Sequence, residues 1–118
     1  MKRVITTEDI RRWAMALPEV TEKSHFKFKV PVFQVSGKTF LGMGRHEDTA
    51  IFCIPEDAAE AAAIANPDTY ESVRRKDSRR SFLGLQVRLY GLDRGRAQEL
   101  VEQAWRTHAP KRLMSKHS

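Results

Sequence analysis

The chain has 118 residues, of which 41% are hydrophobic and 31% charged, and it carries a net charge of +6. This length fits one hydrophobic core and is too short for two, and the apolar content excludes a disordered chain. Cys53 is the only cysteine, which excludes an internal disulfide and a multi-cysteine metal site. No apolar run is long enough for a signal peptide or a membrane span, so we expect a cytoplasmic protein that does not bind membranes.

The positive charge is unevenly distributed along the chain. Residues 46–73 contain seven acids and no lysine or arginine, so the rest of the chain carries +13. This asymmetry indicates that one part of the surface attracts polyanions and another repels them. A solvated charged surface without any ligand gives the same pattern.

A first helix is predicted to begin at Thr6 or Thr7, because a threonine hydroxyl caps a helix and two acids follow in the first turn. Apolar residues then recur with helical spacing at Ile10, Trp13, Ala14 and Leu17. This spacing places them on one stripe that faces a core, and Pro18 ends the helix.

From residue 22 to residue 54 the pattern changes to short runs of Phe, Val and Ile between turn residues, which predicts an antiparallel meander. Its clearest part is a hairpin, in which residues 32–35 and 38–41 flank Ser36 and Gly37. Glycine adopts the positive φ that such a two-residue turn requires. A strand over residues 50–54 follows and stops at Pro55.

Pro55 and the acids after it open an alanine-rich helix that ends at residues 66–68, and its small side chains allow a close approach to a sheet. Residues 70–73 are predicted to form a short strand. Residues 74–80 then carry five cations in seven positions, which predicts an exposed loop.

Residues 81–90 form the clearest strand, because alternate positions are apolar and one face is therefore buried. These positions are Leu83, Leu85, Val87 and Leu89. Asp93 caps the last helix, whose amphipathic stripe comprises Ala97, Leu100, Val101, Ala104, Trp105 and His108. Residues 109–110 end this helix, so we expect a domain over residues 1–110 and a loose basic tail over residues 111–118.

The strands are grouped together rather than strictly alternating with helices, which indicates an α+β fold with helices packed on an antiparallel sheet. One face of this sheet is expected to carry, at these or adjacent positions, Val32, Phe40, Phe52, Leu85, Val87 and Leu89. Trp13 and Trp105 lie on the apolar stripes of their helices and should pack against that face.

Several segments, in this order, resemble the MmcQ/YjbR family of small bacterial proteins. Residues 17–22 (LPEVTE) are similar to the family's signature after the first helix, and residues 31–40 (PVFQVSGKTF) to its hairpin. The proline before the alanine-rich helix, the strand after the basic loop and residues 100–105 (LVEQAW) fit as well, so the likeness covers nearly the whole chain. There are two departures from the family: Phe82 stands in place of a frequent Trp, and Ala104-Trp105 in place of a frequent Ser-Tyr pair.

The resemblance implies a fold similar to that of bacterial frataxin-like (CyaY-like) proteins and a DNA-binding role through a "double wing" of two basic projections. It does not imply iron delivery, because frataxin-like iron binding uses an acidic ridge on the first helix. In this chain Arg11 and Arg12 follow Glu8 and Asp9 in that helix.

The sequence contains no P-loop, Rossmann glycine pattern, Ser-His-Asp arrangement or cluster of metal ligands, so we expect no enzyme, no cofactor and no metal site. Its histidines are scattered, at His25, His46, His108 and His117. Glu56 and Glu60 share one helical face, which is most simply a solvated surface.

Cations in three places carry the functional hypothesis. Lysines alternate with phenylalanines in residues 23–29, one lysine lies on the hairpin, and cations crowd residues 74–80. The candidate residues for nucleic-acid binding are Lys23, Lys27, Lys29, Lys38, Arg74, Arg75, Lys76, Arg79 and Arg80. Two basic projections of this kind could contact DNA phosphates without reading the base sequence.

The same cations have a simpler explanation, because lysines on an edge strand prevent aggregation and surface arginines keep a small protein soluble. The alternative hypothesis is therefore an adaptor that binds another protein or a small ligand. In both cases we expect a monomer.

Overall fold

The computed structural model of the chain describes residues 5–24, 30–44, 49–74, 82–90 and 92–113. In chain order the elements are α1 (Thr7–Met15), β1 (Val20–Ser24), β2 (Pro31–Val35), β3 (Lys38–Met43), β4 (Thr49–Phe52), α2 (Glu56–Ala65), β5 (Tyr70–Arg74), β6 (Phe82–Arg88) and α3 (Arg94–His108). The six strands form one antiparallel sheet in the order β1-β2-β3-β4-β6-β5. The expected α+β architecture is thus confirmed.

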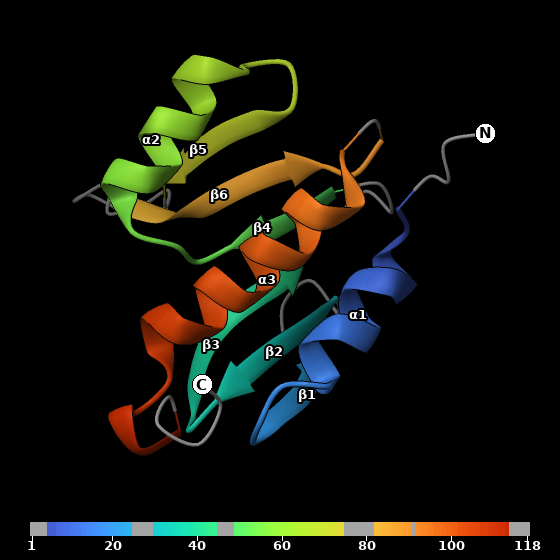
Figure 1. Ribbon diagram of the computed structural model, residues 1–118, viewed down its shortest axis with the longest axis vertical. Helices are drawn as coiled ribbons and strands as arrows, with labels where there is room; N and C mark the ends of the chain where they lie inside the picture. Colours follow the sequence, from blue (N-terminus) through green and yellow to red (C-terminus); the bar gives the residue numbers. More distant parts are fainter. Residues whose placement is uncertain (1–4, 25–29, 45–48, 75–81, 91, 114–118) are drawn as a thin grey trace.

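The helices pack on one face of the sheet (Figure 1). Helix α3 lies on β3 and β4 and contacts α1, which also touches β1, whereas α2 covers β5 and β6. The opposite face of the sheet is covered by none of these helices, and this asymmetry defines the two sides of the molecule.

The core lies between the helices and the sheet. Its centre is a row of neighbouring side chains in register across four strands, each with no exposed surface, formed by Phe33, Leu41, Phe52 and Leu85. The other predicted core residues of the sheet are buried except Val32, which is half-buried. Side chains alternate between the two faces of a strand, so Phe33 takes the core position and Val32 projects from the uncovered face.

Two register shifts interrupt this alternation. The first, next to Phe33, leaves Phe40 without a partner on β2, and both Phe40 and Leu41 are fully buried. The second, at the end of β5, leaves Leu83 without a partner on β5. Leu83 is only half-buried, so the predicted alternation over residues 81–90 holds for the other three leucine and valine positions but not for Leu83.

Local signals set several element boundaries as predicted. Thr6 caps α1 in a reciprocal arrangement with Asp9, and Asp93 accepts a hydrogen bond from the backbone N–H of Arg96 at the start of α3. Ser36 and Gly37 both have positive φ, 51° and 80°, which matches a hairpin turn whose twist suits the flanking strands. Boundaries elsewhere differ by one or two residues, for example in β4, which ends at Phe52.

The two tryptophans have different environments. Trp105 is completely buried, and its Nε1 donates a hydrogen bond to the carbonyl oxygen of Pro18 at 3.2 Å. Trp13 is half-buried, and the guanidinium of Arg94 lies 5.2 Å from the centre of its ring. The expectation that both tryptophans pack on the core is met fully by Trp105 and partly by Trp13.

The packed part of the chain extends beyond residue 110. Leu113 is 3% exposed and belongs to the core, and the side chain of Arg112 forms an ion pair with Glu19 at 2.9 Å. The segment that the sequence suggested as a loose tail is therefore attached to the domain at least as far as Leu113.

We expect replacement of Trp105 by alanine to lower the free energy of unfolding by about 3 to 5 kcal/mol, because it leaves a large cavity and removes a buried hydrogen bond. Urea denaturation followed by circular dichroism measures this loss. Replacement of Tyr90, which is 76% exposed, is the matched control and should change stability by less than about 0.5 kcal/mol. Equal losses for the two variants would contradict the assignment of Trp105 to the core.

Candidate nucleic-acid interface

The sheet has two ends, and the connections between strands distribute the predicted cations between them. At one end of the sheet, which we call the hairpin end, β2 connects to β3 through Ser36 and Gly37. There β4 and β5 also end and β6 begins. We call the other the far end, where β2 and β4 begin and β3 and β6 end.

Lys38 and Arg74 lie at the hairpin end, the first on β3 and the second on β5. Lys23 lies near the far end on the edge strand β1, paired with Val32, and its side chain is exposed. The predicted cations are therefore not on one surface, since Lys23 is separated from Lys38 and Arg74. Lys27, Lys29, Arg75, Lys76, Arg79 and Arg80 lie outside the described residues.

Arg74 is part of a strand and not of a loop, contrary to the prediction for residues 74–80. Its guanidinium lies 2.5 Å from the carboxylate of Glu56 and 3.3 Å from that of Glu60, both on α2. The two glutamates were expected to be solvated surface, but they face Arg74. Much of the charge of Arg74 is thus compensated within the domain, and the pairs fix the start of α2 to the end of β5.

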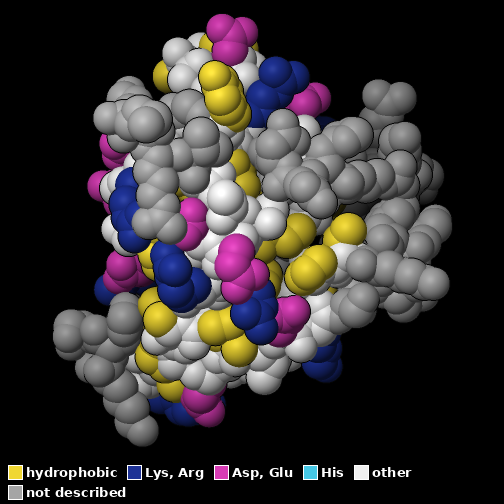
Figure 2. Space-filling view, turned by 90° about the vertical axis from the view of Figure 1, so that its right-hand side faces the viewer, with side chains coloured by type: hydrophobic (Ala, Val, Ile, Leu, Met, Phe, Trp, Pro, Cys, Tyr) yellow, Lys and Arg dark blue, Asp and Glu magenta, His cyan; other side chains and the backbone are white. Residues whose placement is uncertain are grey.

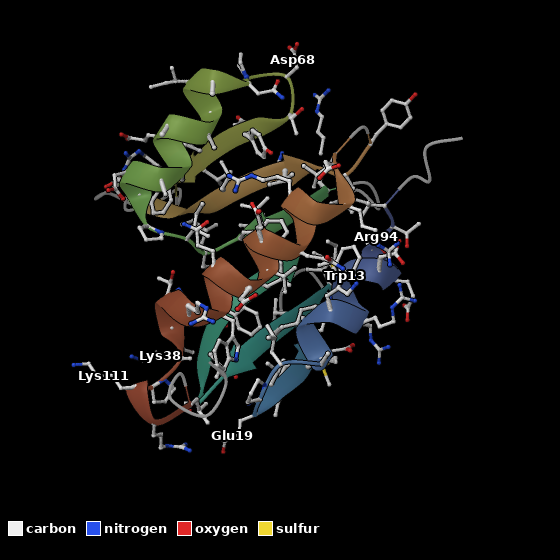
Figure 3. All side chains as sticks on the ribbon, in the orientation of Figure 1. Trp13, Glu19, Lys38, Asp68, Arg94 and Lys111 are labelled. Carbon is white, nitrogen blue, oxygen red and sulfur yellow. The ribbon has the colours of Figure 1, made fainter. Side chains whose placement is uncertain are left out.

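Lys111 is a cation at the hairpin end that the sequence-based candidates omit. His108 Nε2 lies 3.0 Å from the carbonyl oxygen of Cys53. The backbone N–H of Cys53 in turn donates a hydrogen bond to the carbonyl oxygen of Phe40. These contacts bring the C-terminal end of α3 to the beginning of β3, and Figure 3 shows Lys38 and Lys111 at the same corner of the molecule. The apolar spacing of Trp105, Ala109 and Leu113 continues the stripe of α3 and could have indicated this attachment.

Lys38 and Lys111 are exposed, and neither has a carboxylate within ion-pair distance among the described residues. Most described arginines differ in this respect. Ion pairs within the domain join Arg11 to Glu8 and Glu22, Arg12 to Asp9, Arg96 to Glu99, Arg106 to Glu102 and Arg112 to Glu19. The hydrogen bond and charge of Glu22 raise the pKa of Arg11.

The far end has no continuous basic patch among the described residues. Figure 2 views this side, and there the blue and magenta side chains are interspersed. The described cations therefore offer no extended phosphate-binding surface at this end.

A groove of about 480 Å³ runs along α3, lined by Pro55 and by polar residues of the helix. Its cations are already paired, Arg96 with Glu99 at 3.3 Å and Arg106 with Glu102 at 2.8 Å. The groove therefore offers no unpaired charge for a ligand.

None of the His, Cys, Asp and Glu side chains in this part of the chain forms a group of three that could hold a metal ion. The ring of His108 lies against a carbonyl oxygen, which can only accept, so its Nε2 donates and serves a structural contact. Within the same ranges no helix is both long and apolar enough to span a bilayer.

The family model for YjbR matches residues 15–107. The chain belongs to the YjbR family. The match extends from the end of α1 to the last turn of α3, so the resemblance noted in the sequence is confirmed. No curated protein matches the chain.

A solved structure supports the YjbR-like fold. The chain is similar to the Deinococcus radiodurans protein DR2400, which carries the domain name DUF419, with a TM-score of 0.70 and 17% sequence identity. The similarity covers 86% of this chain and 77% of the other. At this identity it shows the fold alone.

We expect replacement of Arg74 by alanine to lower the free energy of unfolding by no more than about 1 kcal/mol, because all three partners of the ion pairs are partly exposed and screened by solvent. Urea denaturation at low and high salt measures the effect, which should shrink at high salt. Arg88, exposed on β6, gives the control variant. A loss above about 2 kcal/mol would show that Arg74 has a larger structural role.

Proposed function

We propose that the domain binds nucleic acid through phosphate contacts made at the hairpin end, and that it acts by binding and not by catalysis. The observation that carries the proposal is the β5–β6 hairpin. Arg74 and Phe82 are paired at its end, and the chain between them contains four cations and one acid. The ion pairs of Arg74 with Glu56 and Glu60 connect the end of β5 to α2, so the strand end from which the basic segment starts is held in place.

Lys38 and Lys111 add to this proposal because they lie at the same end and have no acidic partner among the described residues. Such cations attract phosphates by charge and by the release of counterions, without sequence readout. Lys23 lies toward the opposite end of the sheet, so it is not part of this interface.

The test is a fluorescence-anisotropy titration with duplex DNA across a salt series. The variant changes Arg75, Lys76, Arg79 and Arg80 to glutamine and retains Arg74. If about three of these cations contact phosphates, the slope of log affinity against log salt should flatten by about 2 to 3, since each neutralised phosphate contributes about 0.9. The loss should be similar on unrelated DNA sequences.

The matched control changes Lys23 to glutamine, which we expect to alter the slope by less than about 1. Unfolding midpoints of both variants should equal that of the parent. An unchanged slope in the four-residue variant, or no binding by the parent at about 50 mM salt, would refute the proposal.

The alternative is a protein-binding domain. The uncovered face of the sheet favours it, because this broad surface bears apolar side chains and no helix. Absence of DNA binding in a correctly folded protein would leave this role as the better one.

A further inference from the structure

The uncovered face of the sheet has a defined row of side chains at its middle. In register across all six strands, this row consists of Lys23, Val32, Gly42, Ile51, Gln86 and Glu71. None of the six is buried, whereas the row of neighbours on the other face forms the core. The row therefore projects away from all three helices.

The ends of this row carry opposite charges. Lys23 on β1 and Glu71 on β5 are both exposed, and neither has an ionic partner among the described residues. Glu71 differs in this from the other described glutamates, which form ion pairs. These are Glu8, Glu19, Glu22, Glu56, Glu60, Glu99 and Glu102.

Between its charged ends the row carries the half-buried Val32, Gly42, Ile51 and Gln86, so its middle has two apolar side chains and no charge. A Cβ atom at Gly42 would lie 3.4 Å from Cγ1 of Val32, and one at Gly84 would lie 3.0 Å from Cγ2 of Ile51. The two β-branched side chains thus reach across neighbouring glycines. An uncharged centre of β-branched side chains and glycines suits contact with a second sheet, as in face-to-face sheet packing.

A partner for this face needs an uncharged middle, with a negative charge opposite Lys23 and a positive charge opposite Glu71. A second copy of the same face meets all three requirements, provided that the two-fold axis runs parallel to the strands between β3 and β4. This axis places β1 over β5 of the other copy. An axis across the strands would instead place like charges together, so the charges select one arrangement.

We propose that two copies of this chain associate through the uncovered faces of their sheets, in a two-fold dimer that pairs Lys23 of each copy with Glu71 of the other. Packed sheets are rotated by roughly 30° from each other, and the long lysine side chain spans the resulting offset. The dimer is formed by residues other than those proposed to bind nucleic acid, so the two proposals can fail independently.

The size of the face sets the strength of the association. Six strands about 4.8 Å apart and about 17 Å long give a contact of about 400 Å² per copy, half of the roughly 800 Å² of a standard interface. We therefore expect a monomer in dilute solution, in agreement with the expectation from the sequence, and dimers only at protein concentrations on the order of 0.1 to 1 mM.

Analytical ultracentrifugation of the full chain, without nucleic acid and at about 50 mM salt, tests the proposal. The expected result is a monomer–dimer equilibrium over about 10 μM to 1 mM. K23E and E71K should each weaken the dimer by at least about tenfold, since each reverses one charge in both symmetric pairs. The double variant K23E/E71K should return to within about threefold of the parent, because it restores both pairs in the opposite sense.

K38E is the control, because Lys38 is exposed at the hairpin end and lies on the helix-covered side of the sheet, so its dimerisation should equal that of the parent. The milder variants K23Q and E71Q should shift the equilibrium in the same direction as the charge reversals. A chain that remains monomeric at about 1 mM would overturn the proposal. So would single variants that dimerise like the parent, or a double variant as weak as the singles.

Discussion

The burial of Trp105 is the contact on which the rest of the molecule depends. Its ring is fully enclosed and its indole N–H is bonded to the carbonyl of Pro18, so one side chain joins the last helix to the segment after the first. Helix α3 is thereby held across β3 and β4 and against α1. With α2 on the same side, α1, α2 and α3 all lie on one face of the sheet. The uncovered face and the position of Lys111 both follow from this arrangement.

The features that were correctly predicted from sequence have local causes. The Thr6 hydroxyl that caps α1, the turn with glycine at positive φ and the apolar stripe of α3 each depend on residues a few positions apart. The burial of Phe40 beside Leu41 could not be predicted, because it results from the register of β3 against β2. Likewise the partners of Arg74 are 14 and 18 residues away in sequence. The separation of Lys23 from Lys38 required the strand order and direction.

The distribution of charge acquires a different meaning once the fold is known. Two acids of the acidic stretch, Glu56 and Glu60, form ion pairs with Arg74 where β5 ends, next to the basic segment. A charged side chain is available to a ligand or to another protein when it forms no ion pair within the domain. Among the described residues this holds for Lys38, Lys111, Lys23 and Glu71. A two-fold axis parallel to the strands would also keep both hairpin ends on the same side of a dimer. Self-association and phosphate binding are therefore sterically compatible.

The order of the strands has a consequence for how the chain reaches this state. β1 to β4 pair with their neighbours in sequence, but the second partner of β4 is β6, which comes later in the chain. The hydrogen bond from Trp105 to Pro18 joins residues 87 positions apart. Long-range contacts of this kind slow folding, because a large loop closes before they form. During synthesis the first four strands therefore emerge well before α3 can cover Phe33 and Leu41. A chain that stops short of α3 would expose this row, and we expect it to aggregate on the ribosome or to depend on chaperones.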